Sequence, residues 1–280
     1  MITLEHVTFQ YKGGDRPAID DVSVHIRDGE FVGLIGAGGS GKTTFTYLLN
    51  GVVPHHYEGD FYGRALVEGM DTALSSLTDL SRAVGSVFED IDAQMVSSAV
   101  EDEMLFALVN FGFTRQETDR RIEDALTDVG LRDLRHRDLD TLSGGQKQKV
   151  VIAAILALSP RVLVLDEPTG ELDPAGSLRI YELLRQLNRT KGTTIIVAEQ
   201  KLDLLSAFAD RLLVMKQGQI VLDGSVRSVM GDVGALAEAG LQGPPVSVLY
   251  DRLRRRGYYA GEMPLTTEEA ERMVREAMAC

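Results

Sequence analysis

The sequence predicts an α/β fold with an antiparallel β portion, a helical subdomain and a small C-terminal extension. The apolar runs Val162–Leu165 and Thr194–Val197 are continuous, which is typical of strands in a parallel sheet that is buried on both faces. Apolar residues at helical spacing over 180–187 lie between these runs, and Gly192 ends that helix. A strand, a glycine-rich loop and a helix also follow one another over 31–49. Strands joined through helices in this way form a parallel α/β core.

The first forty residues predict β-strands. Apolar and polar residues alternate around Leu4–Phe9 and over Val22–Ile26, which is the period of a half-buried strand. Turns are predicted at Lys12–Asp15 and Arg27–Gly29, because glycine and aspartate favour tight turns. The region therefore contributes strands rather than helices.

The middle of the chain predicts helices. From about Leu74 to Leu158 the pattern is mostly helical. Thr114 and Glu117 have the spacing of a capping box, in which each residue satisfies a free backbone N–H group of the other. We expect a helical subdomain at about 90–160.

The composition changes after Gly231. Glycines and prolines between 234 and 245 predict a linker, and residues 266–269 predict the start of a last helix. We therefore divide the chain into one domain over 1–234 and a C-terminal extension over 235–280.

The composition excludes several classes of protein. The chain has 280 residues and a formal net charge of −13, so we expect no nucleic-acid partner. Its longest apolar run, Val150–Leu158, is shorter than the ~20 residues of a membrane-spanning helix. The first residues lack the pattern of a secretory signal. The single cysteine, Cys280, excludes an internal disulfide and suits a reducing cytoplasm.

Residues Gly36–Thr43 match the phosphate-loop pattern G-x-x-x-x-G-K-[ST], between a predicted strand and a predicted helix. Glycines let backbone N–H groups point at a phosphate, and the start of the helix adds positive charge. Lys42 is expected to bridge the β- and γ-phosphates of a nucleotide, and the Thr43 hydroxyl to ligate Mg²⁺. A plain glycine-rich turn is the alternative. The residues predicted to bind the nucleotide here are Gly36, Ala37, Gly38, Gly39, Ser40, Gly41, Lys42, Thr43 and Thr44.

Two carboxylates, Asp166 and Glu167, follow the apolar strand Val162–Leu165. Asp166 at the strand end can hold Mg²⁺, and Glu167 is placed to polarise an attacking water. The alternative is a surface pair that caps the strand. Because a phosphate loop is present as well, we predict that Asp166 binds metal and that Glu167 is catalytic.

A third motif, Leu142–Gln146, reads LSGGQ and precedes a predicted helix. With the two motifs above, it makes residues 1–230 resemble the ATP-binding cassette (ABC) ATPases. The resemblance implies a RecA-like core and an ATPase that uses Mg·ATP at the interface of a dimer. It implies that Ser143, Gly144, Gly145 and Gln146 contact the ATP bound to the opposite subunit. An ordinary serine–glycine helix cap is the alternative.

The resemblance assigns further residues and exposes two departures. Tyr11 corresponds to the aromatic residue that stacks on adenine, and Gly170–Asp173 to the D-loop, where Glu171 replaces a small residue. Glu89 stands where the family has a glutamine that contacts Mg²⁺ and the attacking water. Gln200 stands at the position of the switch histidine. Glu89 and Gln200 are assigned to the catalytic group, and Glu89 is also assigned as a metal ligand. Lys42, Asp166 and Glu167 keep the family pattern, so ATP binding is expected.

Several stretches resemble the ATPases of energy-coupling factor (ECF) importers: Leu49–Gly51 with Pro54–His55, Asp90–Gln94, Val100–Glu103 and Pro264–Ala270. The resemblance implies an ATPase pair at the cytoplasmic face of the membrane, docked on an integral membrane scaffold and a substrate-binding membrane protein. The imported substrate would be a vitamin-like micronutrient or a metal ion. The second ATPase subunit could be a copy of this chain or a different cassette.

Two other functions remain open. One is a regulatory, weakly hydrolysing cassette in a heterodimer, which Glu89 and Gln200 favour. The other is a soluble ABC ATPase outside transport, which the acidic charge disfavours.

Three further sequence features each have a structural interpretation as well as a functional one. His55–His56 lack a third metal ligand nearby, so a solvated loop is favoured. The basic cluster Arg252–Arg256 is a solvated face or a contact for a partner or lipid headgroup. Met95 and Met104–Phe106 are either core residues or a docking surface for the membrane subunit.

Overall fold

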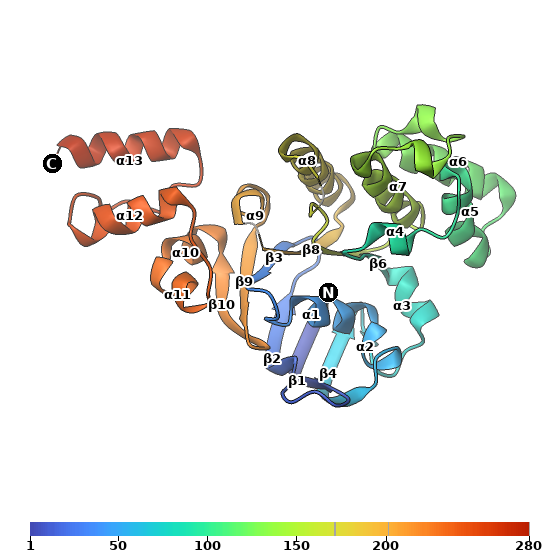
Figure 1. Cartoon of the computed structure of the whole chain (residues 1–280), viewed down its shortest axis with the longest axis horizontal. Helices are drawn as coiled ribbons and strands as arrows, with labels where there is room; N and C mark the ends of the chain where they lie inside the picture. The colour runs from blue at the N-terminus through green and yellow to red at the C-terminus, as the bar shows by residue number, and fades with distance from the viewer. Residues whose placement is uncertain (171, 201, 280) are drawn as a thin grey trace.

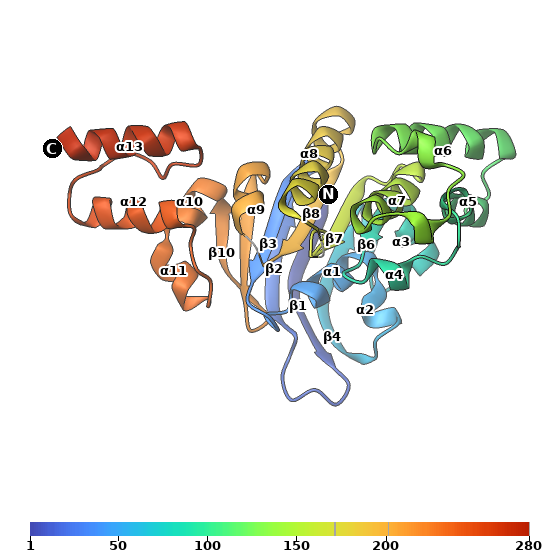
Figure 2. The same ribbon diagram turned by 45° about the horizontal axis from the view of Figure 1, so that its top comes forward.

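The computed structural model describes residues 1–170, 172–200 and 202–279, and it has two β-sheets between two groups of helices (Figure 1). Two residues named above, Glu171 and Cys280, lie outside the described residues. Helices α5–α7, within residues 100–157, lie on one side of the sheets, and α10–α13, within residues 226–279, lie on the opposite side, as the turned view also shows (Figure 2).

The strands form an antiparallel sheet and a mostly parallel one. The first has the order β2-β1-β4-β5, and its pairs are all antiparallel. The second has the order β10-β9-β3-β8-β7-β6, with β10 the antiparallel edge strand. The strands are β1 Ile2–Tyr11, β2 Ile19–Ile26, β3 Phe31–Gly36, β4 Gly59–Val67, β5 Met70–Asp71, β6 Val84–Val87, β7 Val162–Asp166, β8 Thr194–Glu199, β9 Arg211–Lys216 and β10 Gln219–Ser225.

The helices include none within the described ranges that is long and apolar enough to cross a membrane. They are α1 Lys42–Asn50, α2 Val52–His55, α3 Leu77–Ala83, α4 Ile91–Gln94, α5 Val100–Asn110, α6 Arg115–Asp128, α7 Gly144–Ala157, α8 Pro174–Lys191, α9 Leu202–Phe208, α10 Val226–Gly231, α11 Val233–Glu238, α12 Pro245–Arg255 and α13 Thr267–Ala279. Two short 3₁₀ turns, Arg132–Leu134 and Leu139–Thr141, lead into α7.

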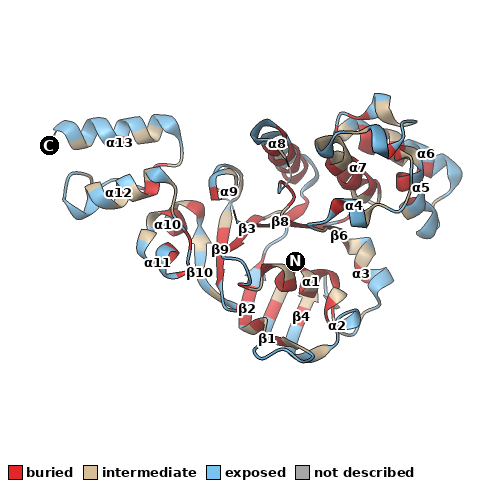
Figure 3. Cartoon of the chain, in the orientation of Figure 1, coloured by how far each residue is buried: buried red, intermediate tan, exposed pale blue. Residues whose placement is uncertain are grey.

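The core is concentrated in the sheets, in α1 and in α7, whereas the outer faces of α5, α6 and α13 are exposed (Figure 3). Helix α1 lies between the two sheets (Figure 1). Its buried Phe45, Leu48 and Leu49 pack in one apolar cluster with residues of both sheets. The parallel strands are buried at every position of β3, β7 and β8. The loops that follow these parallel strands all lie at one edge of the buried sheet, and the functional residues are found in them.

Several local predictions are confirmed. The continuous runs at 162–165 and 194–197 are adjacent parallel strands, and α8 joins them and ends at Gly192. The capping box of Thr114 and Glu117 is present at the start of α6. A second capping box, between Ser143 and Gln146, begins α7.

One prediction is confirmed with an addition, and one is wrong in part. The region 74–158 is mostly helical as predicted, and β6 also runs through it and pairs in parallel with β7. The expected linker contains the short helix α11 and the start of α12, and Leu236 within it is fully buried. Leu236, Tyr250 and Met273 belong to the same apolar cluster as the parallel sheet. Glycines and prolines here separate short helices, whose apolar side chains still reach the core; the division of the chain at residue 234 stays a prediction.

Candidate active site

The predicted catalytic residues meet at the carboxyl edge of the parallel sheet. The phosphate loop follows β3, Asp166 ends β7 and Glu167 follows it, Gln200 follows β8, and Glu89 comes two residues after β6. Because β6, β7, β8 and β3 are neighbours in this order, four separate loops converge on one place. Ligands of open α/β sheets bind outside this edge.

The phosphate loop depends on two glycines that leave no room for a side chain. A Cβ on Gly36 would lie 2.4 Å from Ser40 Oγ and 2.5 Å from the carbonyl oxygen of Met215. Gly41 has φ +107, and a Cβ there would lie 2.4 Å from the carbonyl oxygen of Ala18. A positive φ and such close backbone approach both require glycine. The loop thus folds back against β9 and the segment before β2.

Lys42 is the cation at the centre of this loop. Its side chain is buried, with 6% of the residue exposed. The ammonium group donates hydrogen bonds to the carbonyl oxygens of Gly36 at 2.9 Å and Ala37 at 3.4 Å. A polyanion bound at the loop would meet this ammonium, the start of α1 and the loop N–H groups together.

A cavity of about 270 Å³ opens over the loop. Its walls also include residues that sequence reasoning missed, because no motif marks them. Arg16 and Ala18 come from the segment before β2, and Gln217 and Gly218 form the turn between β9 and β10. That turn is held to the loop, since the Gly218 N–H donates to the Ser40 carbonyl at 2.9 Å. The lining residues are Arg16, Pro17, Ala18, Gly39, Ser40, Gly41, Lys42, Thr43, Thr44, Gln217 and Gly218.

Tyr11 lies beside this cavity without lining it. Its hydroxyl is 3.0 Å from Oγ1 of Thr44. Its ring makes edge contacts with Phe9, at a centroid distance of 4.8 Å, and with Tyr57, at 5.8 Å. The adenine-stacking role of Tyr11 stays a prediction.

Asp166 is a buried carboxylate that lacks full compensation. Only 2% of the residue is exposed, and its Oδ1 has no hydrogen-bond partner among the described residues. Burial raises the pKa of Asp166, with a further upward contribution from Glu167 and Glu89, while a hydrogen bond with Thr43 and the charge of Lys42 act in the opposite direction. A cation bound beside Asp166 would compensate this buried carboxylate, so its environment suits a cation site.

The residues present fit Mg²⁺. Within the described ranges, no three His, Cys, Asp or Glu side chains are grouped to hold a metal by themselves. Mg²⁺, however, is held in proteins by one or two carboxylates, with waters and substrate phosphates completing its shell. The hydroxyl of Thr43 and the free oxygen of Asp166 supply oxygen donors of this kind beside the phosphate loop.

Glu167 and Gln200 are in direct contact. The Gln200 side-chain amide donates to Oε1 of Glu167 at 2.6 Å. Glu167 has φ 46, a strained backbone conformation for a glutamate, and its N–H donates to the Ala198 carbonyl at 2.9 Å. Backbone strain of this kind is often kept where it aims a functional side chain.

Glu89 lies at the edge of a second cavity, of about 300 Å³. Its carboxylate is exposed but close enough to Asp166 to disfavour ionisation of that group. The segment before it is fixed by Gln94, whose side chain donates to the Ser86 carbonyl at 2.8 Å and accepts from the Phe88 N–H at 3.0 Å. The sequence assigns Gln94 only to an ECF-like stretch. In the fold it binds backbone groups of Ser86 and Phe88, and so fixes the end of β6 just before Glu89.

The LSGGQ segment lies outside the cavity over the phosphate loop of its own chain. None of Ser143–Gln146 lines the cavity over that loop, whereas Gly144 lines the second cavity together with Glu89, Glu167 and the buried Gln148. Ser143 and Gly144 are at the start of α7, and Gly144 is exposed. The segment is thus available to a molecule outside this chain.

Comparisons with known proteins agree with this geometry. A family model described as ABC transporter matches residues 19–170. A relative from Pyrococcus abyssi, provisionally named an ABC transporter ATP-binding protein, is 40% identical over 257 residues, which is 92% of each chain. The chain belongs to the ABC transporter ATP-binding proteins.

Solved structures of ABC cassettes have the same fold. One is cbiO1 of Clostridium perfringens, part of the ABC transporter complex cbiONQ, with a TM-score of 0.76, 31% identity, and coverage of 89% of this chain and 97% of that one. Another is a dimeric cassette bound to ADP and Pi in a post-hydrolysis state, with a TM-score of 0.70, 26% identity, and coverage of 81% and 99%. The predicted ABC fold and the resemblance to ECF ATPases are confirmed. This ABC protein is an ATPase that uses ATP and Mg²⁺.

Arg16→Gln tests the side of the pocket that the motifs did not predict. Arg16 has no side-chain partner among the described residues and lines the same cavity as Lys42, so we expect it to contact the nucleotide. A lost charge-assisted hydrogen bond corresponds to about a tenfold rise in the Kd for Mg·ATP. Calorimetry measures this, with Arg27→Gln, in the turn at the far end of β2, as the control; equal Kd values in both variants would exclude the contact.

Asp166→Asn tests the uncompensated carboxylate. The folded pKa of Asp166 is raised, so the wild-type chain loses stability as the pH rises from the unfolded value through the folded one. The asparagine variant lacks this loss. In Mg²⁺-free buffer, the unfolding free energy of Asp166→Asn minus that of the wild-type chain should therefore increase from pH 4 to pH 8. Urea unfolding followed by circular dichroism measures it, and a gain that is absent or falls with pH would contradict the assignment.

Proposed function

We propose that this ABC ATPase is the ATP-hydrolysing subunit of an ECF-type importer, at the cytoplasmic face of the membrane. It would couple ATP binding and hydrolysis to the uptake of a vitamin-like micronutrient or a metal ion through membrane partners. The observation that carries the proposal is the similarity to cbiO1 over 89% of the chain, in addition to the ECF-like stretches of the sequence. The protein cbiO1 is itself part of a transporter complex.

The exposed face of α5 supports a membrane-protein partner. Phe106 and Val109 are 54% and 61% exposed, whereas Met104 on the opposite face is fully buried. A cavity of about 760 Å³ opens between α5 and α6, with Leu105, Val109 and Phe113 in its walls. Met104 is therefore a core residue, and Phe106 is the docking candidate. An apolar helix face beside a hollow suits an inserted helix of a partner.

The catalytic assignments follow from the site. Lys42 and the loop N–H groups would hold the triphosphate, and Tyr11 would stack on the adenine. Glu167 would accept a proton from the attacking water, and Gln200, which already donates to Glu167, would orient that carboxylate. Thr43, Asp166 and Glu89 would hold Mg²⁺, which on binding neutralises charge that develops on the phosphates.

The second subunit would complete each site. Because Ser143–Gln146 lie away from their own phosphate loop, we propose that they serve the ATP held by the other cassette, which offers its own LSGGQ segment in return. The N-terminus of α7 and the Ser143 hydroxyl would then face the γ-phosphate.

A regulatory, weakly hydrolysing cassette is the second candidate. The Glu167–Gln200 hydrogen bond favours it, since this bond uses one of the two N–H groups of the amide, and an amide brings no positive charge to the γ-phosphate. ATPase assays of this chain alone and with a second cassette separate the two functions. ATP hydrolysis by this chain alone supports the importer motor. Hydrolysis that occurs only with a second cassette, and that is lost when the catalytic glutamate of that second cassette is mutated, supports the regulatory role.

Phe106→Asp tests the proposed membrane partner. We expect the wild-type chain, expressed in its host and extracted in mild detergent, to copurify with integral membrane proteins. The aspartate places a charge on the apolar face, and burial of an unpaired charge is strongly unfavourable. Copurification should fall at least tenfold, while the ATPase rate of the isolated chain stays within twofold.

Leu74→Asp is the matched control, because Leu74 is also apolar and 85% exposed but belongs to the segment between β5 and α3 rather than to α5. If membrane proteins still copurify with the Phe106→Asp variant, the contact with the membrane partner lies outside this face of α5. A wild-type chain that brings down no membrane protein would contradict the importer itself.

A further inference from the structure

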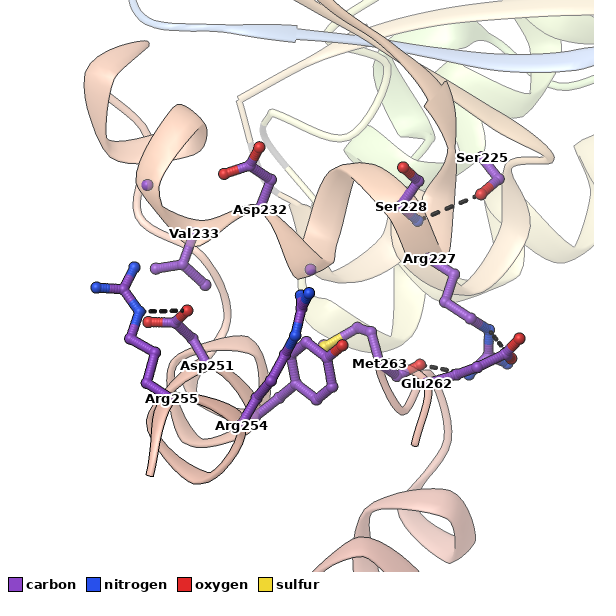
Figure 4. A pocket seen from close by; sticks show the side chains of 13 residues that line it. Ser225, Arg227, Ser228, Asp232, Val233, Asp251, Arg254, Arg255, Glu262 and Met263 are labelled. Carbon is purple, nitrogen blue, oxygen red and sulfur yellow. Dashed lines mark hydrogen bonds and ion pairs between the residues drawn. The ribbon is translucent and has the colours of Figure 1, made fainter. Parts of the chain in front are cut away.

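A cavity of about 810 Å³ lies among the C-terminal helices, away from the ATP site. It is bounded by the end of β10, by α10 and α11, by α12 and by the loop before α13 (Figure 4). It shares no lining residue with the cavity over the phosphate loop. Strand β10 separates the two, since Gln217 and Gly218 precede it at one end and Ser225 is its last residue at the other.

Most of the charged groups that line this cavity are already paired. Arg255 donates to Asp251 at 2.8 Å. Arg227 forms ion pairs with Glu269 at 3.1 Å and Glu262 at 3.4 Å. Asp232 accepts the Ala235 N–H at 3.0 Å and caps α11. Each of these groups has its own partner on the protein.

Arg254 is the exception. Its guanidinium group has no hydrogen bond, ion pair or ring contact within the described part of the chain. In Figure 4 its side chain stands between the Asp251–Arg255 pair on one side and Arg227, Met263 and Glu262 on the other. Arg254 is exposed, and within the described part of the chain it is the one lining arginine whose guanidinium group has no partner.

The rest of the wall combines apolar residues with two serines, Ser225 and Ser228. Tyr250 and Met263 are 6% and 2% exposed, and both belong to the apolar core cluster. Val233 and Gly231 complete this part of the lining. A volume of this size is within the range of small-molecule sites, and the lining offers both apolar side chains and polar groups that can bind a ligand atom.

We propose that this cavity binds a small organic monocarboxylate, with its carboxylate on Arg254 and its hydrocarbon part against Tyr250, Val233 and Met263. A guanidinium group binds a carboxylate through two parallel N–H···O bonds. Among the described lining residues only one guanidinium group is unpaired, so one carboxylate can be held in this way. Inorganic phosphate, with a charge closer to −2 at neutral pH, would face Asp232, Asp251 and Glu262 without a second free cation among the described lining residues.

The test uses the full chain and a panel of probes. The probes are the straight-chain monocarboxylates from acetate to octanoate, phenylacetate, the neutral amide of each acid, and inorganic phosphate. Ligand-observed NMR titrations give the Kd values. We expect saturable binding of at least one carboxylate, at least tenfold weaker binding of its amide, and no displacement by Mg·ATP.

Arg254→Gln should weaken that carboxylate at least tenfold, since it removes the unpaired cation and keeps a polar side chain. Arg256→Gln is the matched control, because Arg256 is exposed on the same segment but does not line the cavity. It should leave the Kd within twofold.

Four results would overturn the proposal: no carboxylate binds saturably, an amide binds as tightly as its acid, phosphate binds in preference, or Arg254→Gln leaves the Kd unchanged. Displacement by Mg·ATP would also overturn it, because the probe would then be entering the phosphate-loop cavity. The binding measurements need neither hydrolysis nor a membrane partner, so the site stands or falls independently of the proposed transport function.

Discussion

The buried ammonium group of Lys42 is the constraint around which the ATP site is organised. The folded chain gives this charge carbonyl dipoles from Gly36 and Ala37 but no carboxylate partner among the described residues. A buried cation that forms no ion pair is unfavourable, and a triphosphate supplies the missing anionic partner. The glycines at 36 and 41 allow the loop to close around the ammonium, because a side chain at either position would collide with neighbouring atoms.

The parallel sheet adds the opposite charge at the same edge. Asp166 ends β7, Glu167 follows it and Glu89 comes after the neighbouring β6, so the order of strands brings three carboxylates to the edge where Lys42 lies. Burial, together with their mutual repulsion, raises the pKa of Asp166. The chain without its ligands thus holds a cation and a set of anions that are only partly satisfied, and Mg·ATP matches both. Gln94 and Gln200 orient this arrangement, one at the end of β6 and the other on Glu167.

The phosphate loop, the strands β7 and β8 and the capping box of α6 could be predicted from the sequence, because each depends on neighbouring residues. Strand β6 could not, since Val84–Val87 is too short to show a period and contains Gly85. Arg16 and the Gln217–Gly218 turn belong to the pocket only because distant segments pack on Ser40 and Gly41. The segment after Gly231 resembles a linker in sequence, because its glycines and prolines conceal buried residues such as Leu236.

The measurement that tests the central claim most directly is the binding of Mg·ATP to Lys42→Ala by isothermal titration calorimetry. The variant removes the buried ammonium at the loop and leaves the glycines and the sheet in place. The account predicts that the Kd rises at least a hundredfold, which corresponds to about 2.7 kcal/mol. Mg·ATP binding as tight as that of the wild-type chain would show that the nucleotide is held elsewhere and would contradict the account.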